Sequence, residues 1–579
     1  MRWQLASAAA DTVGELAREL GISPLTCRLL AVRGITEPAA AEQFLHPRLA
    51  HLHDPFLMAG MEAAVARLRR AIAAQEKILI YGDYDVDGTT AVVVLLAALG
   101  SLGACVDVHI PHRLRDGYGM RLPVVERAAA EGYTVLVSVD TGIREHEVVA
   151  RARELGIDCI ITDHHLPKTS LPDACAILNP RRPDCSYPDK NLSGVGVAFK
   201  LAQALLGAGM SEAVLRSYLK VVAIGTIADV VPLTGENRVI ARFGLTGLRQ
   251  PVQAGLSALL EVAGLNGRTP SAGDIAFRIA PRLNAAGRME DARAVIELLR
   301  TSDPARAREI ALGLEELNSE RQRVEESILN EIEETLQSHP ELSERYALVF
   351  AGEGWHRGVL GIVAQRVVER RYRPTLVIGV ADGAGQGSGR SISNFHLLNA
   401  LTAVQDVFER FGGHAAAAGF TLPSNLLGEL DARFEAYARS VLSPEDLEPL
   451  LRVDAEVDLE QVDWPLYEEL RKLEPFGMGN PTPVFVARNL HLALSPQIVG
   501  KKHLKLKVGK GSKLFNALGW NQGGRAGLPE PGEFLDLAFT LDENFYQGIA
   551  SLQLIIKDLR PNPDGSGLKM AQKTSPAGV

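Results

Sequence analysis

Three aspartates at alternate positions, Asp83, Asp85 and Asp87, follow a short apolar run in the stretch ILIYGDYDVDGTTAVVV. Carboxylates this close repel one another unless cations hold them, so the spacing indicates a metal site. The stretch also begins like a calcium-binding EF-hand loop, which requires a bidentate Glu at its twelfth position. That position is Val94, and a strand-like run precedes the loop where an EF-hand has a helix. We therefore interpret the aspartates as ligands at the carboxyl end of a strand.

Three other segments carry residues of metal-ligand type. TVLVSVD ends in Asp140, IDCIITDHH ends in Asp163, His164 and His165, and VVAIGTIADVVPL carries Asp229. We interpret each as the end of a strand, and the strand ends of one parallel sheet converge on one crevice. A mixed set of carboxylates and imidazoles suits Mn²⁺ or Mg²⁺ better than zinc. Two such ions promote in-line displacement at phosphorus, so these residues predict hydrolysis of a phosphoester.

The elements that position these residues alternate between strand and helix from residue 77 to 180. Apolar, strand-like runs at 77–81, 105–111, 134–140 and 157–163 are separated by helical patterns, and further helices are expected at 197–206 and 212–224. Such alternation is typical of β-α-β units around a parallel sheet. It predicts a doubly wound α/β domain.

The rest of the chain divides by pattern. Residues 303–340 are densely charged between an Asp-Pro start and a His-Pro end, which predicts a long, largely solvated helix. Residues 346–440 again mix strands with helices and contain GQGSGRS and FGGHAAAAGF, which we interpret as glycine-rich loops. From about 450 onward, short alternating strands with glycine and proline turns predict a small β-barrel. The composition of 563–579 predicts disorder.

The composition is that of a soluble globular protein with several domains. The chain has 579 residues, of which 46% are hydrophobic and 23% charged, and its net charge is −9. The apolar run at 91–99 is too short to span a bilayer, and the first residues do not resemble a signal peptide. Five scattered cysteines argue against a disulfide framework or a zinc ribbon and fit a reducing cytoplasm. No G-x-x-x-x-G-K-[ST] motif occurs, which argues against an ATP-driven motor.

A basic segment near the C-terminus is the candidate for binding nucleic acid in spite of the negative net charge. GKKHLKLKVGKGSK holds six lysines. Strand alternation puts Lys505 and Lys507 on one face and the apolar residues between them on the other. Phe515 and Trp520 follow, and aromatic rings beside lysines predict a stacking groove for single strands.

The four segments DYDVDG, SVDTG, TDHH and IADVVPL resemble, in this order, the motifs of the DHH phosphoesterase superfamily. Within it, further stretches resemble the RecJ family of single-stranded-DNA exonucleases: SGVGVAFKL, APRLNAAGRM, GWHRGVLGIVA, GSGRS, GGHAAAAGF and LEPFGMGNPTPVF. The resemblance runs from about residue 50 to 560. It implies a 5′ to 3′ exonuclease that hydrolyses single-stranded DNA to 5′-mononucleotides in recombination and repair.

The same resemblance implies how the chain is organised. We expect an N-terminal cap segment (1–50), a DHH catalytic domain (51–300), a connecting helix (301–345), a DHHA1 domain (346–445), an OB-fold single-strand-binding domain (446–562) and a disordered tail (563–579). The expected partners are single-stranded DNA, a helicase and a single-strand-binding protein, with no membrane involved.

Carried over by motif, the resemblance implies two divalent metal ions, Mn²⁺ or Mg²⁺. The expected ligands are Asp85 and Asp140 for one ion, and Asp87, Asp140, His164 and Asp229 for the other. Many superfamily members have a histidine at the position that Tyr81 occupies here. Either Asp83 supplies the missing ligand, or the first ion binds more weakly and keeps more water.

The remaining site residues are also implied by the resemblance. Asp140 is expected to bridge the two ions, His165 to face the scissile phosphate as a cationic stabiliser or proton donor, and Asp163 to orient an imidazole. Phosphate contacts are expected from four further residues: Arg282, Arg288, Arg390 and His414.

Two other functions stay open at this point. A small-substrate DHH enzyme, such as an oligoribonuclease or a pyrophosphatase, has no need of a basic barrel, so residues 450–560 count against it. A replication scaffold that has lost its metals is expected to show eroded aspartates, whereas only Tyr81 departs from the ligand pattern.

Overall fold

The structure is a computed structural model that describes residues 1–113, 115–117, 119–525 and 527–562. The chain forms two compact units. The two-sheet unit consists of His53–Val231 and Phe243–Glu448, and the barrel unit consists of Met1–Leu52, Pro232–Arg242 and the described residues from Pro449 onward. The expected disordered tail at 563–579 lies outside the described residues. Within the described ranges, no helix is both long and apolar enough to cross a membrane.

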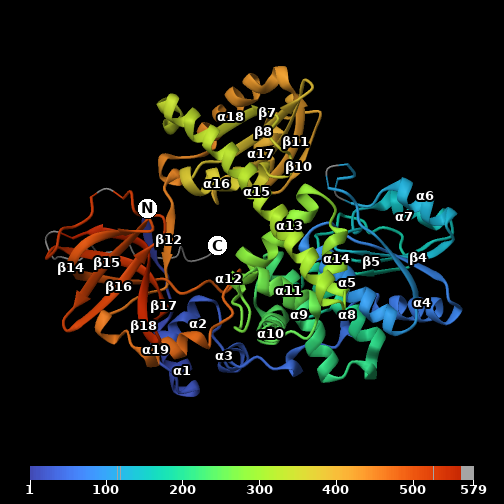
Figure 1. The fold of residues 1–579 in the computed structure, drawn as a ribbon, viewed down its shortest axis with the longest axis horizontal. Helices are drawn as coiled ribbons and strands as arrows, with labels where there is room; N and C mark the ends of the chain where they lie inside the picture. Colours follow the sequence, from blue (N-terminus) through green and yellow to red (C-terminus); the bar gives the residue numbers. More distant parts are fainter. Residues whose placement is uncertain (114, 118, 526, 563–579) are drawn as a thin grey trace. The chain divides into compact units, whose positions relative to one another are not determined.

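The first sheet of the two-sheet unit is parallel and five-stranded (Figure 1). Its strands are β2 (Lys77–Tyr81), β3 (Cys105–His109), β4 (Tyr133–Val139), β5 (Asp158–Thr162) and β6 (Ala176–Leu178). The first four lie where the apolar runs predict them, and β6 is too short to give a periodic signal. The order is β3-β2-β4-β5-β6, so the direction of winding reverses between β2 and β4. Open α/β sheets bind their ligands at such a switch point.

Helices cover both faces of this sheet, which confirms the doubly wound prediction. One face packs on α6 (Leu122–Ala130) and α7 (His146–Glu154) through a single apolar cluster. The other face contacts α5 (Val86–Ser101) and α8 (Gly194–Leu206), and α5 packs on α9 (Glu212–Ala228). Almost every residue of α5 is buried. This explains why its sequence is apolar on all sides.

One strand prediction is wrong. VVAIGTIA, the first eight residues of VVAIGTIADVVPL, is the end of α9, so Asp229 caps the C-terminus of a helix and does not end a strand. A short apolar run has the same composition in a buried helix and in a buried strand, and periodicity alone does not separate the two.

Further helices lie between the strands and beyond the first sheet. They are α4 (Met61–Ala74), α10 (Gly235–Gly247), α11 (Ala254–Val262), α12 (Ala272–Asp274), a π-helical turn (Ile275–Ile279), α13 (Ala280–Met289), α14 (Arg293–Arg300) and α15 (Pro304–Ser338). Asp303 caps α15 by accepting a hydrogen bond from the Ala305 N–H at 2.9 Å, as its Asp-Pro start predicts. Most residues of α15 are exposed, as its dense charge predicts, and one face is buried along its length, from Ala307 to Leu336.

The second sheet has the order β10-β11-β9-β8-β7. Its strands are β7 (Leu348–Glu353), β8 (Thr375–Ala381), β9 (Ala384–Arg390), β10 (Arg410–Gly413) and β11 (Ala417–Pro423), with α16 (Leu360–Arg371), α17 (Leu397–Ala403) and α18 (Leu427–Val441) packed around them. Both glycine-rich stretches are therefore mainly strand and not loop. A Cβ on Gly387 would lie 2.2 Å from the Phe420 ring, and one on Gly389 would lie 2.7 Å from Leu376. These glycines make room for core side chains.

The barrel unit contains a closed five-stranded barrel, as predicted. Its strands are β14 (Phe485–Val499), β15 (His503–Lys510), β16 (Lys513–Gly519), β17 (Phe534–Tyr546) and β18 (Ile549–Pro561), ordered β14-β15-β16-β18-β17 and closed by pairing of β14 with β17. This is the strand order of an OB-fold. The N-terminal helices α1 (Ala10–Leu20), α2 (Pro24–Val32) and α3 (Pro38–Leu45) share one apolar core with the barrel, and β1 (Arg2–Leu5) pairs with β12 (Leu450–Val453).

Candidate active site

The first three aspartates lie between the end of β2 and the first turn of α5. Asp85 caps α5 by accepting a hydrogen bond from the Gly88 N–H at 3.0 Å. Asp87, in the first turn, accepts hydrogen bonds from the N–H groups of Gly194 and Val195 at 2.6 and 2.8 Å, at the start of α8. Both carboxylates therefore lie at the positive ends of helix dipoles. This arrangement holds the carboxylates in place without neutralising them.

Asp140 follows β4 and has the left-handed backbone angle φ 59°. This conformation is uncommon for a residue other than glycine and is found where a structure holds a functional side chain in place. Its N–H donates to the carbonyl of Thr162 at 2.9 Å, on the neighbouring strand. A Cβ on Gly194 would lie 2.5 Å from the Asp140 Oδ1 atom. The glycine at the start of α8 therefore gives the Asp140 carboxylate its space.

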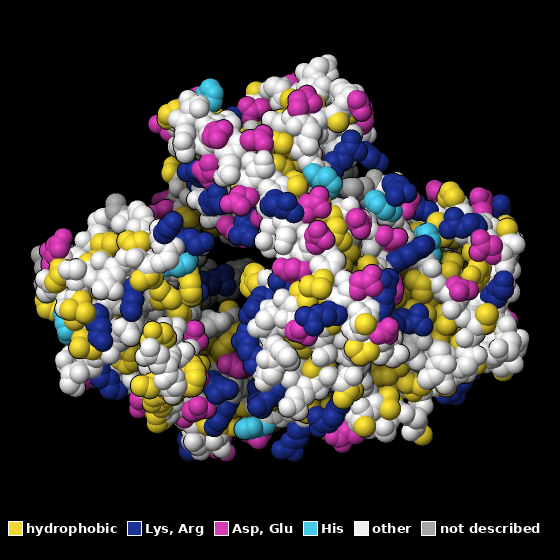
Figure 2. All heavy atoms as spheres, viewed as in Figure 1, with side chains coloured by type: hydrophobic (Ala, Val, Ile, Leu, Met, Phe, Trp, Pro, Cys, Tyr) yellow, Lys and Arg dark blue, Asp and Glu magenta, His cyan; other side chains and the backbone are white. Residues whose placement is uncertain are grey.

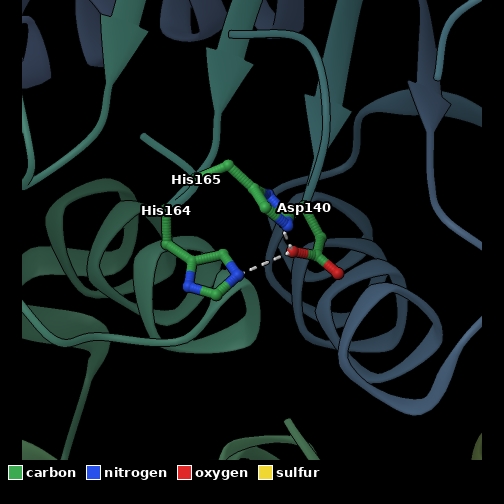
Figure 3. A group of neighbouring side chains, drawn as sticks. All are labelled: Asp140, His164 and His165. Carbon is green, nitrogen blue, oxygen red and sulfur yellow. Dashed lines mark ion pairs between the residues drawn. The ribbon is translucent and has the colours of Figure 1, made fainter. Parts of the chain in front are cut away.

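The two histidines that follow β5 both point toward Asp140 (Figure 3). His164 Nε2 lies 3.2 Å from Asp140 Oδ1, 3.5 Å from Asp229 Oδ2 and 3.9 Å from Asp87 Oδ2. His165 Nδ1 lies 4.0 Å from the same Asp140 oxygen. The fold thus brings together ligands that follow β2, β4, β5 and α9 and are far apart in the sequence.

The potential ligand atoms form three overlapping groups, and within each group the atoms lie within 4.8 Å of one another. The first is Asp83 with Asp85 and Asp140, the second is Asp87 with His164 and Asp229, and the third is Asp140 with His164 and His165. Among the described residues, Asp83 Oδ1, Asp229 Oδ2 and both ring nitrogens of His164 are buried without a hydrogen-bond partner. Buried polar atoms of this kind are costly unless something binds them. Two divalent cations fit both the donor set and the orphaned atoms.

The position of Tyr81 bears on the first of these groups. Its side chain is buried in the apolar cluster under α6 and α7, and its hydroxyl donates to the Gly119 carbonyl at 3.2 Å. It therefore does not join the ligand atoms. Asp83 does, which favours Asp83 as the ligand that replaces the missing histidine.

The pKa values of the site residues indicate a binding site for cations. Burial, and then the charge of Asp85, raises the pKa of Asp87 to about 7. Burial, and then the charges of Asp87 and Asp85, raises the pKa of Asp229 to about 9. Burial lowers the pKa of His164 to about 3, so its imidazole is neutral and free to ligate a metal.

His165 has the opposite character. Burial lowers the pKa of its imidazole, but the hydrogen bond between His165 Nδ1 and Asp163 Oδ1, 2.8 Å long, outweighs burial and raises the pKa above its usual value. Asp163 also accepts hydrogen bonds from the backbone N–H groups of Ile143, His164 and His165. These contacts fix its carboxylate, and with it the orientation of the His165 ring. The pair can hold an imidazolium next to the ligand groups.

Arginine side chains gather beside the aspartates. Burial, and then the charges of Arg113, Arg321 and Arg390, lower the pKa of Arg288 to about 9. Burial, followed by the charge of Arg113, also lowers the pKa of Arg390. Arg113 lies over the Tyr84 ring at 4.9 Å. Cations held this close to one another favour a polyanionic ligand. Sequence reasoning missed Arg113 and Arg321, because neither lies in a stretch that the motifs single out.

The other two residues expected to contact phosphate have different contacts in the structure. Arg282 forms an ion pair with Glu315 of α15 and donates to the carbonyl of Arg278. His414 is exposed in the turn between β10 and β11, where its N–H donates to the Ala417 carbonyl at 2.8 Å. The phosphate contacts of both residues stay predictions.

The basic strand of the barrel alternates as expected. Leu504, Leu506 and Val508 are buried, whereas Lys505 is exposed and Lys507 half-buried. On the face drawn in Figure 2, basic side chains on the barrel are scattered among many hydrophobic ones. The prediction for Phe515 is wrong: only 9% of it is exposed, because it points into the barrel core. Trp520 is 56% exposed and meets the His503 ring edge-on, with 4.7 Å between centroids.

Comparison with known proteins places the chain in a family. Three family models match it: the N-terminal domain of the DHH family over residues 77–226, the DHHA1 domain over 344–440 and the RecJ OB domain over 453–558. It is 39% identical over 561 residues to the single-stranded-DNA-specific exonuclease RecJ of Bacillus subtilis, a match that covers 96% of this chain and 70% of that protein.

Solved structures of RecJ are also similar to this chain. The crystal structure of RecJ in complex with Mn²⁺ from Thermus thermophilus matches with a TM-score of 0.82 and 32% identity, over 96% of this chain and 79% of that one. The Mg²⁺ complex from the same organism matches with a TM-score of 0.76 and 29% identity, over 96% and 78% of the two chains. With its DHH motifs, its DHHA1 sheet and its closed OB barrel, the chain belongs to the RecJ family.

Proposed function

We propose that this protein is a single-stranded-DNA-specific exonuclease that hydrolyses phosphodiester bonds with two divalent metal ions, Mn²⁺ or Mg²⁺. The observation that carries the proposal is the set of overlapping ligand groups at the switch point of the first sheet. Relatives named as single-stranded-DNA-specific exonucleases and RecJ structures that hold Mn²⁺ or Mg²⁺ support it. The direction, 5′ to 3′ with release of 5′-mononucleotides, and a role in recombination and repair are part of the proposal.

Different residues bind the metal ions, donate a proton and bind the phosphate groups of the strand. Asp83, Asp85 and Asp140 hold one ion, and Asp87, Asp140, His164 and Asp229 hold the other. When bound, the two ions lower the pKa of water and neutralise negative charge in an in-line displacement. The Asp163–His165 pair keeps an imidazolium at the scissile phosphate, where it donates a proton or a hydrogen bond. Arg288 and Arg390 bind phosphate groups of the strand.

The alternatives have less support. A scaffold that binds no metal does not need its metal ligands, whereas here the ligand residues are all present and lie close together. A small-substrate enzyme has no use for a barrel that carries lysines and an exposed tryptophan. A cytoplasmic location, where the five unpaired cysteines stay reduced, and cooperation with a helicase and a single-strand-binding protein complete the proposal.

The direct test is digestion of a single-stranded oligonucleotide labelled separately at each end, with Mn²⁺ or Mg²⁺ and with a blunt duplex as control. We expect metal-dependent release of mononucleotides from the 5′ end and no digestion of the duplex. Release from the 3′ end would overturn the polarity. Binding of the strand without cleavage under either metal would instead favour the scaffold.

Replacing His165 with Gln should lower kcat about 10²-fold or more, because a positioned proton donor contributes about this much. KM and metal affinity should change little, since Gln keeps the size of the side chain. In the wild type, activity that needs protonated His165 is lost as the pH rises through its raised pKa. This alkaline limb should vanish in His165→Gln and move to lower pH in Asp163→Asn. Profiles of kcat against pH test this expectation. An unchanged alkaline limb in both variants would contradict the role of His165 as a proton donor.

Replacing Trp520 with Ala should weaken binding of long single strands by about 1–3 kcal/mol, the usual contribution of one stacked base. The dependence of affinity on salt should stay the same, because no charge is removed. Replacing Lys505 and Lys507 with Ala should instead flatten that dependence. Fluorescence anisotropy at several salt concentrations measures both. Equal affinity of Trp520→Ala and wild type would remove this side chain from the strand-binding surface.

A further inference from the structure

Two buried hydroxyl groups connect the helices beside the second ligand group. Ser193 is the N-cap of α8 and Thr226 lies in the last turn of α9, and both side chains are fully buried. Their oxygen atoms lie 3.0 Å apart, so one hydroxyl donates a hydrogen bond to the other. A buried hydroxyl that loses its partner is costly. The pair is therefore a fixed link between the start of α8 and the end of α9.

On one side, this link leads to Asp87. Ser193 Oγ accepts a hydrogen bond from the Gly196 N–H at 3.2 Å and so caps α8. The two N–H groups that directly follow, those of Gly194 and Val195, are the donors that hold the Asp87 carboxylate. A displacement of the start of α8 therefore moves the groups that place this ligand.

On the other side, the link leads to Asp229, which follows Thr226 by three residues at the C-terminus of α9. The Asp229 Oδ2 atom is buried without a hydrogen-bond partner among the described residues. The next residue, Val230, has the left-handed angle φ 60°, which is strained for a β-branched residue and persists only where the surrounding structure fixes it. The position of the Asp229 carboxylate therefore depends on where α9 ends.

The backbones of α8 and α9 also come close to the ligands. Both helices contact α5 and each other (Figure 1). A Cβ on Gly225 of α9 would lie 3.2 Å from Asp87 Oδ1, and one on Gly194 of α8 would lie 2.5 Å from Asp140 Oδ1. Each of these glycines is the neighbour of one of the two hydroxyl residues. A shift between the helices is therefore passed directly to the carboxylates.

We infer that Ser193 and Thr226 are positioning residues for the second metal ion, because their hydrogen bond fixes the placement of Asp87 relative to Asp229. This inference rests on the proposed function, since it concerns the same metal site. Neither hydroxyl belongs to a ligand group, so the pair acts through the helices that carry the ligands. Partners one step removed from a metal typically change its affinity about 10–100-fold when they are lost.

The link also bears on which ion the site accepts. Mg²⁺ demands nearly ideal octahedral geometry at short distances. Mn²⁺ is the larger ion, so carboxylates that are held less firmly cost it less. Loss of the hydrogen bond should therefore lower activity with Mg²⁺ more than activity with Mn²⁺.

The test replaces Thr226 with valine, which has the same shape but no hydroxyl. In Thr226→Val, one of two Mn²⁺ ions should bind about 10–100-fold more weakly, and it should be the ion that Asp229→Asn also weakens. Calorimetric titration with Mn²⁺ measures this without any DNA. Thr226→Ser keeps the hydroxyl and should restore the wild-type affinity. Ser193→Ala should weaken the same ion, and adding Thr226→Val to it should cause little further loss, because both variants lack the same hydrogen bond.

Thr26→Val is the matched control. Thr26 belongs to the barrel unit, is only 1% exposed, and has its hydroxyl 3.0 Å from that of Ser23, the N-cap of α2. It also donates to Glu469 at 2.7 Å, so this replacement removes two hydrogen bonds where Thr226→Val removes one. Thr26→Val should nevertheless bind both Mn²⁺ ions as wild type does and keep the wild-type ratio of activities with the two metals.

The outcomes distinguish this inference from the proposed function. If Thr226→Val binds both ions as wild type does, or if Thr226→Ser is as weak as Thr226→Val, the hydroxyl pair does not position the ligands. An equal loss of activity with Mg²⁺ and Mn²⁺ would also contradict the inference, because it would point to an effect on the whole fold. If wild type binds two ions but digests no strand, the exonuclease proposal fails, while the titrations still decide the role of the pair.

Discussion

Replacing Asp140 with Asn should abolish nucleotide release while leaving the fold intact. Asp140 belongs to the first ligand group, and its Oδ1 atom also lies 3.2 Å from His164 Nε2 of the second. An amide has the same shape as the carboxylate, but it lacks the negative charge that attracts divalent ions. Loss of this shared ligand weakens both ion sites and removes several kcal/mol of transition-state stabilisation, which corresponds to a rate lower by about 10³-fold or more.

Two measurements check this expectation. Digestion of an end-labelled single strand gives the rate, and calorimetric titration with Mn²⁺ gives the number and affinity of the bound ions. Asp107→Asn is the matched control, since Asp107 lies on β3 of the same sheet but accepts a hydrogen bond from Tyr133 and is outside all three ligand groups. Full Mn²⁺ stoichiometry with wild-type affinity in Asp140→Asn would show that Asp140 does not bridge the ions.

The strands that carry the ligands were predictable, because alternating strand and helix patterns are local properties of the sequence. The runs that became β2, β4 and β5 each end just before Asp83, Asp140 and Asp163, and parallel strands bring such ends to one edge. The placement of Asp229 was not predictable in this way. It depends on α9 packing against α5, a contact between distant segments, and the apolar run before it fits a helix and a strand equally well.

The arginine group was harder to predict for a related reason. Arg113 follows β3 and Arg321 lies in the middle of a charged helix, and each becomes significant only when the tertiary fold brings it near the other arginines. The glycines of GQGSGRS misled in the opposite direction. Their number suggested a loop, whereas Gly387 and Gly389 lie in β9 and make room for Phe420 and Leu376. The sequence shows where glycines and arginines cluster, but their contacts depend on how the chain packs.

Without metal, the two-sheet unit should become less stable as the pH rises from about 6.5 to 9. The pKa of Asp229 is about 9 in the folded protein and 3.8 for the free side chain, so in this range the folded state binds a proton that the unfolded state has lost. Stability falls wherever the folded state binds more protons. Below pH 6.5 the lowered pKa of His164 acts with the opposite sign, which is why the effect is clearest above it. The expected loss from Asp229 is about 3 kcal/mol, at 1.36 kcal/mol per pKa unit.

Mn²⁺ should reverse this trend, because it binds the ionised carboxylates and its affinity rises as they lose protons. Hydrogen-exchange protection factors of α9 and β4, measured with EDTA and with Mn²⁺ at several pH values, give the local stability. Strand β15 of the barrel unit, which contains no carboxylate, is the control in the same sample and should change little. Asp229→Asn should flatten the pH dependence of α9 without metal. If the slope with EDTA equals the slope with Mn²⁺, or if it survives in Asp229→Asn, the buried carboxylates are not its origin and the ligand groups do not bind the ion as proposed.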